Sequence, residues 1–259
     1  MIRVVLVGAA GRMGRAVEAA AAGASDLAIH ARVDLRANLP ADGGVWTDDV
    51  LSVTCPGDVV VDFSAPAGAR AAASACAARG AALVSGSTGL GPDDEALLGE
   101  ASRRVAVLRA SNFSLGIAAL RVALRAALAA VPGDWDVEIV ERHHRLKKDS
   151  PSGTALALAA EVRAARGLPV ESLRHGRQGQ VGERPAAEVG MHAVRGGTWV
   201  GDHQVLLAGG GEWLELRHVA QDRAAFAHGA LAAVRFVATA GPGAYTLEDV
   251  LRAPGPRGR

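Results

Sequence analysis

The sequence is poor in aromatic residues, in lysine and in cysteine. Phe, Trp and Tyr make up 3% of the 259 residues, too few for a surface that stacks nucleobases. The 28 basic residues nearly balance the 27 acidic ones, and the net charge is +1. The chain therefore lacks the basic excess that is typical of nucleic-acid binding. Most of the basic residues are arginines and few are lysines, a preference that we attribute to genomic composition.

The two cysteines, Cys55 in a loop and Cys76 in a helical pattern, form no CxxC spacing. This argues against a zinc site and a disulfide framework, and we expect no metal. No run approaches the roughly 20 apolar residues of a membrane span. The apolar start MIRVVLV is too short for a signal peptide. We expect a cytoplasmic protein with neither a membrane nor a nucleic-acid partner.

Strands alternate with helices in the first part of the chain. Short β-branched runs predict buried strands at 2–7, 27–33, 58–63, 81–85 and 105–109. Helical patterns lie between them at 12–22, 65–82 and 92–103. This alternation predicts an α/β fold with a parallel sheet and right-handed crossovers.

The pattern changes after residue 112. The predicted elements are then helices at 115–131 and 154–166, a strand at 135–141, and strand-like runs with glycine turns between 189 and 219. These runs predict antiparallel strands with hairpins. A last helix begins near Arg223 and returns the chain to the first domain.

We therefore predict two domains. A Rossmann-like dinucleotide-binding domain comprises residues 1–112 and 223–259. An α+β domain with a mixed, largely antiparallel sheet comprises residues 113–222.

A glycine-rich turn, GAAGRMG at 8–14, follows the first predicted strand and opens a helix. It fits GxxGxxG, a looser form of the dinucleotide fingerprint GxGxxG. Such a turn lets backbone N–H groups approach a pyrophosphate. Asp34 ends the second predicted strand, where an acidic residue binds the ribose hydroxyls. The predicted cofactor contacts are Gly8, Ala9, Ala10, Gly11, Arg12, Met13 and Asp34.

Two more loops follow predicted strands, at the sheet edge where open α/β sheets bind ligands. They are Gly86-Ser87-Thr88 and Ala110-Ser111-Asn112-Phe113, and we include both in the predicted cofactor site. Asp34 favours NADH because its carboxylate repels a 2′-phosphate, whereas Arg36 can offset that repulsion. The choice between NADH and NADPH stays open.

The segment 138–155, EIVERHHRLKKDSPSGTA, carries most of the chemical information. It ends a strand pattern with His143, His144 and Lys147 and then starts a helix at Gly153 and Thr154. A helix start suits a carboxylate, and histidine exchanges a proton near neutral pH. We expect a site that holds an acidic small molecule and protonates it. A basic surface loop before a well-capped helix is the alternative interpretation.

This segment resembles the signature of the 4-hydroxy-tetrahydrodipicolinate (dihydrodipicolinate) reductase family, E-I-x-E-x-H-H-x-x-K-x-D-x-P-S-G-T-A. The resemblance continues through GAAGRMG, VDFS, GSTG, ASNFSLG, GDHQVLLAGGGEWLELRHVA and FAHGAL. It implies NAD(P)H-dependent formation of tetrahydrodipicolinate in lysine and diaminopimelate biosynthesis. It also implies hinge closure of two domains and a homotetramer built by the substrate domain.

Carried over residue by residue, the resemblance makes His143 a proton donor or acceptor and Lys147 a second proton donor. It makes His144, Gly153 and Thr154 substrate contacts. After hydride transfer a nearby acid protonates the ring, and the residues do not choose between His143 and Lys147.

Within the cofactor site, some family members have arginine directly after the acidic residue. This chain has Leu35 there, which argues against strong NADPH use.

Other readings remain open. One is a dehydrogenase of the same two-domain plan that acts on another amino or imino acid, such as aspartate. Another is a regulator that binds NAD(P)H without turnover, which has no need of the HHRLK run. The Gly- and Arg-rich segment 176–185 is either a mobile loop over the site or a passive surface loop.

Overall fold

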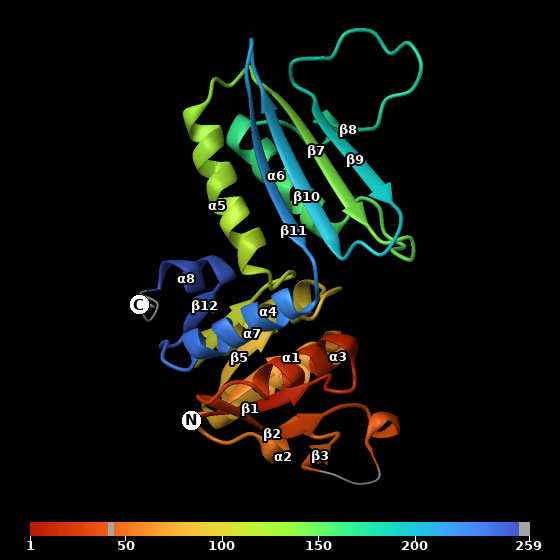
Figure 1. Ribbon diagram of the computed structural model, residues 1–259. Coiled ribbons are helices and arrows are strands. Elements are labelled where there is room, and N and C mark those ends of the chain that lie inside the picture. The colour runs from red at the N-terminus through yellow and green to blue at the C-terminus, as the bar shows by residue number, and fades with distance from the viewer. Residues whose placement is uncertain (41–43, 254–259) are drawn as a thin grey trace. The chain divides into compact units, whose positions relative to one another are not determined.

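The computed structural model describes residues 1–40 and 44–253. The chain divides into two compact units, and Figure 1 shows the elements of each. Unit 1 contains Met1–Leu115 and the segment from Arg223 onward, and unit 2 is Gly116–Asp222. The first division therefore falls at the start of a helix, close to the expected residue 112. Residues 254–259, the end of the predicted return segment, lie outside the described residues.

A seven-stranded sheet forms the centre of unit 1, in the order β12-β6-β5-β4-β1-β2-β3. Every pairing in it is parallel. The strand order runs outward in opposite directions from β1 and β4, so these strands form the switch point at which such sheets bind ligands. The strands are β1 (Ile2–Val7), β2 (Leu27–Val33), β3 (Trp46–Thr47), β4 (Val59–Asp62), β5 (Ala82–Ser85), β6 (Ala106–Arg109) and β12 (Gly243–Tyr245).

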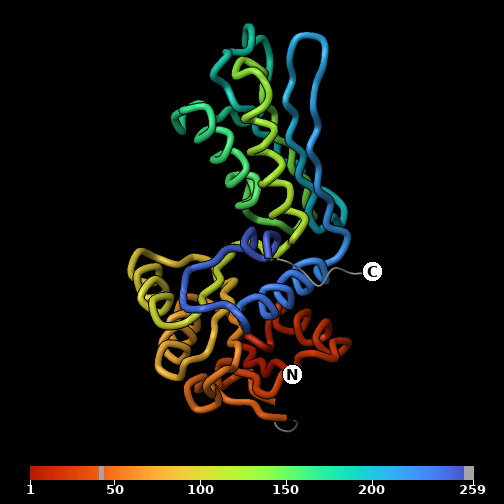
Figure 2. The backbone as a smooth tube through the Cα atoms, turned by 90° about the vertical axis from the view of Figure 1, so that its left-hand side faces the viewer, coloured from red at the N-terminus to blue at the C-terminus, as the bar shows by residue number. Residues whose placement is uncertain are grey.

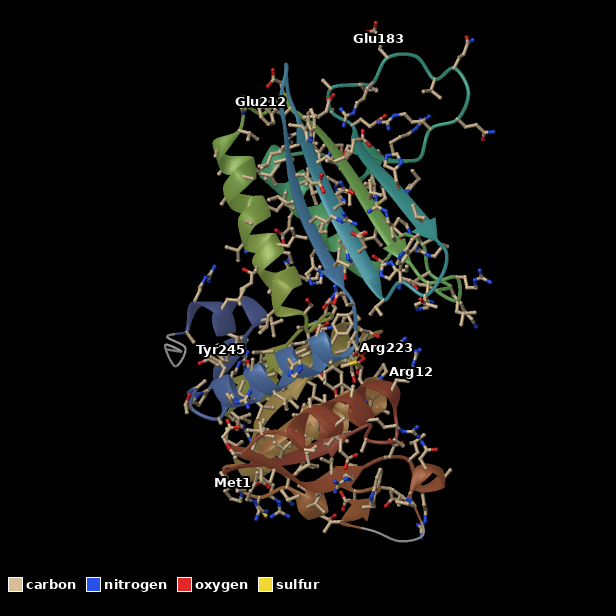
Figure 3. The ribbon with its side chains drawn as sticks, in the orientation of Figure 1. Met1, Arg12, Glu183, Glu212, Arg223 and Tyr245 are labelled. Atoms are coloured by element: carbon tan, nitrogen blue, oxygen red, sulfur yellow. The ribbon has the colours of Figure 1, made fainter. Side chains whose placement is uncertain are left out.

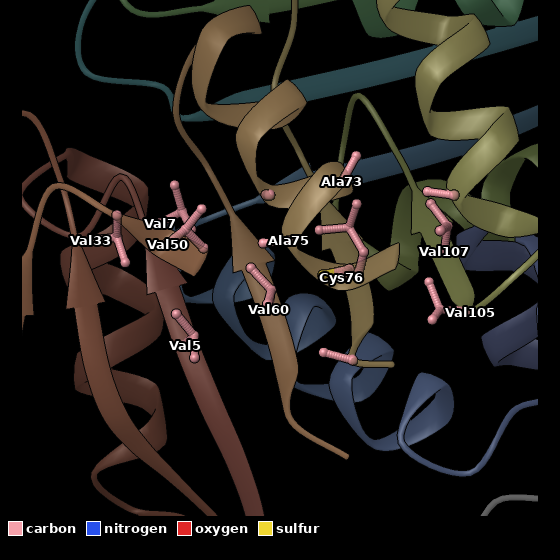
Figure 4. Packing of buried hydrophobic residues seen from close by; sticks show 14 of the residues in the cluster. Val5, Val7, Val33, Val50, Val60, Ala73, Ala75, Cys76, Val105 and Val107 are labelled. Carbon is pink, nitrogen blue, oxygen red and sulfur yellow. The ribbon is translucent and has the colours of Figure 1, made fainter. Parts of the chain in front are cut away.

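Helices cover this sheet. They are α1 (Arg12–Ala21), α2 (Val50–Val53), α3 (Pro66–Arg79), α4 (Pro92–Ser102), α7 (Ala224–Val237) and α8 (Leu247–Arg252). Figure 4 shows Val60 of β4 between Val5 of β1 and the α3 residues Ala73 and Cys76. All four side chains are fully buried. The small side chains of α3 let the helix lie close to the valine-rich strands, which buries apolar surface with few voids.

A five-stranded mixed sheet forms unit 2, in the order β11-β10-β7-β9-β8. Figure 2 shows the helices α5 (Leu115–Ala130) and α6 (Gly153–Arg166) side by side, and both pack against the same sheet face. The strands are β7 (Asp136–His143), β8 (Leu173–His175), β9 (Val189–Arg195), β10 (Gly201–Ala208) and β11 (Trp213–Ala220). Along β7 every second residue is buried, ending with Glu141 and His143.

The fold class is confirmed, but part of the predicted strand pairing is wrong. The predicted hairpin of β10 and β11 is present. However, β9 and β10 are not neighbours, because β7 lies between them and runs parallel to β9. The sheet is therefore antiparallel across β7, β10 and β11 and parallel across β7, β9 and β8. Alternation of apolar residues predicts a strand, but it does not predict which other strand it pairs with.

Short elements escaped the sequence analysis. The strands β3, β8 and β12 are two or three residues long, and α2 has four residues. Such segments hold too few residues to show a period.

No helix in the described part of the chain combines the length and apolarity needed to cross a bilayer.

Candidate active site

A cavity of about 710 Å³ opens at the carboxyl ends of β1, β2 and β4 in unit 1. The glycine turn lines it with Gly8, Ala10 and Gly11. Asp34 and Arg36, which follow β2, line another side. The cavity thus brings together the glycine turn and the acidic residue that the sequence analysis assigned to a dinucleotide.

The glycine turn is shaped by close backbone contacts. Gly8 has φ +77°, and a Cβ atom there would lie 2.5 Å from the carbonyl oxygen of Phe63. A Cβ atom on Gly14 would lie 2.3 Å from the carbonyl oxygen of Gly8. Both positions therefore require glycine. Arg12 opens α1 with an exposed side chain (Figure 3), and Arg15 lines the cavity, although the sequence analysis did not select it.

Asp34 is bonded to the glycine turn. Its Oδ2 accepts a hydrogen bond from the backbone N–H of Ala10 at 2.9 Å. Its Oδ1 accepts from the N–H of Leu35 at 2.9 Å and from the side chain of Asn38 at 2.7 Å. These bonds hold the carboxylate at the cavity wall, where it can accept further bonds from ribose hydroxyls.

A second aspartate braces the neighbouring loops. Asp62, at the end of β4, is fully buried, and its two carboxylate oxygens accept from the hydroxyls of Ser64 at 2.5 Å and Ser85 at 2.8 Å. The backbone N–H of Ser64 also donates to the hydroxyl of Ser87 at 3.1 Å. Asp62 therefore joins Ser64, in the loop after β4, to Ser85 at the end of β5, and Ser64 in turn contacts the loop Gly86-Ser87-Thr88. Sequence analysis did not select Asp62 or Ser64.

The last predicted cofactor loop, Ala110 to Phe113, follows β6. The ring of Phe113 packs edge-on against that of Phe63, with centroids 5.1 Å apart. The side-chain oxygen of Asn112 accepts from the N–H of Ser114 at 2.8 Å. Because β4, β5 and β6 are parallel neighbours, the loops that follow them lie at the same sheet edge. The residues that line the 710 Å³ cavity all lie between Val7 and Ala71 in the sequence. The cavity lining therefore includes neither Gly86–Thr88 nor Ala110–Phe113.

In unit 2, the predicted chemical residues occupy the connection between β7 and α6. His143 is the last residue of β7, two residues beyond the predicted strand end. Gly153 is the first residue of α6, and Ser152 caps this helix by accepting from the N–H of Ala155 at 3.2 Å. The backbone N–H of His144 donates to the carbonyl of Trp199 at 2.8 Å. The connection is thus fastened at both ends.

Glu141 joins these two ends. Its side chain is fully buried, and His143 Nδ1 lies 2.5 Å from its Oε2. Its Oε1 accepts the backbone N–H of Ser152 at 3.1 Å. The guanidinium of Arg195 binds both oxygens at 2.7 and 2.8 Å. A carboxylate only accepts hydrogen bonds, so His143 carries its proton on Nδ1 and keeps Nε2 for other partners.

The charges around His143 oppose one another. Burial lowers the pKa of His143, against the hydrogen bond and negative charge of Glu141, which raise it; the positive charges of Lys147 and Arg195 add to the lowering. Burial alone would raise the pKa of Glu141, but hydrogen bonds from Arg195 and His143 outweigh it and the pKa is lowered. Glu141 therefore stays ionised beside the imidazole.

A second buried imidazole faces the first. The ring of His203, on β10, meets that of His143 edge-on with centroids 5.1 Å apart. Its Nε2 lies 3.1 Å from the hydroxyl of Ser152. Burial, together with the nearby His143, lowers the pKa of His203 to about 4. His203 is therefore a neutral packing and hydrogen-bonding partner at physiological pH.

The remaining predicted residues lie on the same connection. Lys147 is half-buried, and its Nζ lies 2.8 Å from a carboxylate oxygen of Asp149. Gly153 is exposed at the first turn of α6, next to Thr154. His143, Lys147 and the start of α6 thus all belong to the short β7–α6 connection of unit 2.

The loop at 176–188 is anchored to β7. Arg177 binds Glu138 at 2.8 Å, and Arg184 binds Asp136 at 2.5 Å and Glu138 at 3.1 Å. Asp136 and Glu138 lie on the face of β7 opposite to His143, because alternate residues face opposite ways. Glu183 marks the tip of this loop in Figure 3. These contacts favour a fixed surface loop.

The residues that sequence analysis missed in unit 2 are Glu141, Arg195 and His203. Glu141 and His143 share a strand face at a spacing of two, which was a readable signal. Arg195 contacts Glu141 across 54 positions of sequence, and no local pattern reveals that contact.

The two halves of the chain match two family descriptions. Residues 2–113 match "Dihydrodipicolinate reductase, N-terminus" and residues 116–251 match "Dihydrodipicolinate reductase, C-terminus". The chain belongs to the dihydrodipicolinate reductase family. The predicted family is therefore confirmed, and with it the class of nicotinamide-dependent oxidoreductase.

Individual relatives support membership of the same family. A 4-hydroxy-tetrahydrodipicolinate reductase from Thermomicrobium roseum is 46% identical over 97% of this chain and 100% of its own length. One from Myxococcus xanthus is 43% identical over 97% of this chain and 98% of its own. The solved dipicolinate-bound dihydrodipicolinate reductase from Paenisporosarcina sp. TG-14 is 25% identical, covers 96% of this chain and 99% of its own, and has a TM-score of 0.80.

Proposed function

We propose that the protein reduces 4-hydroxy-tetrahydrodipicolinate to tetrahydrodipicolinate with NADH or NADPH, in lysine and diaminopimelate biosynthesis. The observation that carries the proposal is the β7–α6 connection, where an imidazole held by Glu141 adjoins the capped start of a helix. A helix start binds a carboxylate, and the imidazole supplies a proton. Family membership supports the substrate and the pathway.

The cofactor site of the proposal lies in unit 1. Gly8, Ala9, Ala10, Gly11, Arg12 and Met13 would hold the pyrophosphate, Asp34 the ribose, and Gly86–Thr88 and Ala110–Phe113 the nicotinamide end. The open cavity at the glycine turn and the bond between Ala10 and Asp34 support this assignment. A bound reduced nicotinamide supplies the hydride. Asp34 and Arg36 line the same cavity, so the walls contain groups that suit either cofactor.

The substrate site of the proposal lies in unit 2. Gly153 and Thr154 would bind one carboxylate at the α6 start, and His144 and Lys147 would add positive charge. His143 would deliver the proton from Nε2, with Lys147 as a second donor. A cytoplasmic homotetramer completes the proposal and is supported by the family resemblance alone.

The test is an assay of NAD(P)H oxidation at 340 nm with 4-hydroxy-tetrahydrodipicolinate and each reduced cofactor. We expect turnover with this substrate and none with aspartate and NAD(P)⁺. His143→Gln is expected to lower kcat by about 10²- to 10⁴-fold with little change in cofactor affinity. Turnover of another imino acid only, or cofactor binding without any turnover, would reject the proposal in favour of a different dehydrogenase or a regulator.

A further inference from the structure

Unit 2 contains a fully buried carboxylate, Glu141, that accepts from four donor atoms. Glu141 accepts from His143, from both terminal nitrogens of Arg195 and from the N–H of Ser152. Isolated buried charges are costly, and they persist when they are paired and hydrogen-bonded. Arg195 supplies the counter-charge here, and it also donates to the carbonyl of Asp149 in the same connection at 2.8 Å.

We propose that Glu141 is the positioning residue of the reaction: it holds the His143 proton on Nδ1, so that Nε2 is the nitrogen that exchanges a proton with substrate, and it fixes this imidazole relative to the carboxylate-binding start of α6. This inference rests on the proposed function; Glu141 is the second glutamate of the signature segment, to which the resemblance assigned no role, and Arg195 lies outside that segment. Arg195 acts through Glu141 by keeping it charged and oriented.

The hydrogen bonds decide the tautomer. Oε2 of Glu141 can only accept, so Nδ1 donates to it both before and after His143 gives up a proton. The exchanged proton therefore resides on Nε2 in every turnover. The negative charge also stabilises the imidazolium that the reaction needs. Carboxylates that orient a catalytic histidine act in the same way in hydrolases.

The second carboxylate oxygen of Glu141 sets the distance between His143 and the start of α6. Oε1 accepts the N–H of Ser152, the residue that caps α6. One carboxylate thus links the strand that carries His143 to the helix whose first turn, at Gly153 and Thr154, would hold the substrate. A side chain that links a proton donor to a binding site controls the geometry of the reacting atoms.

The test compares Glu141→Gln with a matched control, Glu138→Gln. Glu138 lies on the opposite face of the same strand and is bound by two arginines, Arg177 and Arg184, and by His192. It resembles the Glu141 cluster in composition but does not contact His143. Loss of general strand stability is therefore common to both variants, whereas loss of His143 orientation belongs to Glu141→Gln.

The first readout is the ¹⁵N NMR spectrum of the histidine ring, which needs no substrate. We expect neutral His143 to carry its proton on Nδ1 in the wild type and in Glu138→Gln. In Glu141→Gln the amide oxygen is taken by Arg195, so Nδ1 faces an NH₂ group and the proton moves to Nε2. An unchanged tautomer in Glu141→Gln would overturn the inference even if the enzyme proves to act on another substrate.

The second readout is kinetic. Glu141→Gln should lower kcat by about 10²- to 10⁴-fold with substrate KM changed by less than about tenfold. The charged groups facing His143 are Glu141 on β7, Arg195 on β9 and Lys147 on the connection, with His203 on β10. Removing the one negative charge lowers the His143 pKa further, so the fall of kcat with rising pH should begin at lower pH.

A third variant addresses folding. Glu141→Gln leaves Arg195 without its carboxylate, so Glu141→Leu combined with Arg195→Met removes both charges together and leaves Nδ1 of His143 without an acceptor at this position. The double variant should fold and show the same loss of kcat. Wild-type kcat in either folded variant would reject the inference. An inactive wild type would instead reject the proposed function, and the NMR result would still stand.

Discussion

At the scale of the residue, the use of lysine is selective. The chain contains two lysines, Lys147 and Lys148, and both lie between β7 and α6. Every other basic side chain that can form an ion pair is arginine or histidine. Arginine keeps its proton at all relevant pH values, whereas lysine can release one. A lysine kept in this loop suggests a task that a permanent charge does not fulfil.

We therefore expect Lys147→Arg to lower kcat by about 10²-fold while substrate KM changes by less than about tenfold, because the charge remains and the transferable proton does not. Lys148→Arg is the matched control, since Lys148 is exposed and adjacent. Steady-state kinetics of both variants provide the measurement. If Lys147→Arg equals Lys148→Arg in kcat, Lys147 supplies charge alone.

At the scale of the element, β4 carries an aspartate beside each end. Asp58 precedes the strand and binds Arg3 at 2.9 Å and His30 at 3.1 Å. Asp62 ends the strand and accepts hydrogen bonds from Ser64 and Ser85 at the carboxyl edge of the sheet. The two residues are similar in burial and opposite in position. They allow the bracing of the cofactor loops to be separated from the stability of the strand.

Asp62→Ala should raise the Kd for NADH by about tenfold, the effect of losing the hydrogen bonds that hold Ser64 and Ser85 in place. Asp58→Ala should lower thermal stability without changing that Kd by more than about twofold. Fluorescence titration of NADH, with Tm measured on both variants, distinguishes them. An unchanged NADH affinity in folded Asp62→Ala would show that the loops keep their shape without the brace.

At the scale of the whole molecule, unit 2 carries a charge cluster around Glu138 on the face of its sheet opposite to His143. Although burial raises the pKa of Glu138, hydrogen bonds from Arg177, His192 and Arg184 outweigh it and lower the pKa to about 2. A carboxyl group whose pKa is lower in the folded than in the unfolded state stabilises the fold at pH values above its unfolded pKa of 4.5. This stabilisation is lost as the pH falls towards the folded pKa of about 2.

The free energy of unfolding should accordingly fall between pH 5 and pH 2.5, with Glu138 accounting for on the order of 1–3 kcal/mol. Glu138→Gln should be less stable than wild type at pH 7 and should approach it in acid. Urea unfolding followed by circular dichroism across this range measures both. Glu183→Gln, at the exposed tip of the anchored loop, is the control and should track the wild type throughout. A constant difference between wild type and Glu138→Gln at all pH values would contradict this prediction.

The sequence by itself determined the parts of this protein that depend on neighbours along the chain. The β-branched runs and alanine-rich helices define the parallel sheet of unit 1, and the glycine turn and the signature segment define the family. Helix caps, turns and strand periods arise from residues a few positions apart, so they can be read directly.

Only the tertiary structure decided which distant groups meet. Arg195 binds Glu141, β7 separates β9 from β10, and Asp62 at the end of β4 bonds to Ser85 at the end of β5. A strand shows the same alternation whichever strand it pairs with, and the spacing of two that places Glu141 beside His143 does not show that Arg195 binds the same carboxylate. The orientation of His143 therefore depends on packing across the sheet, which local spacing does not encode.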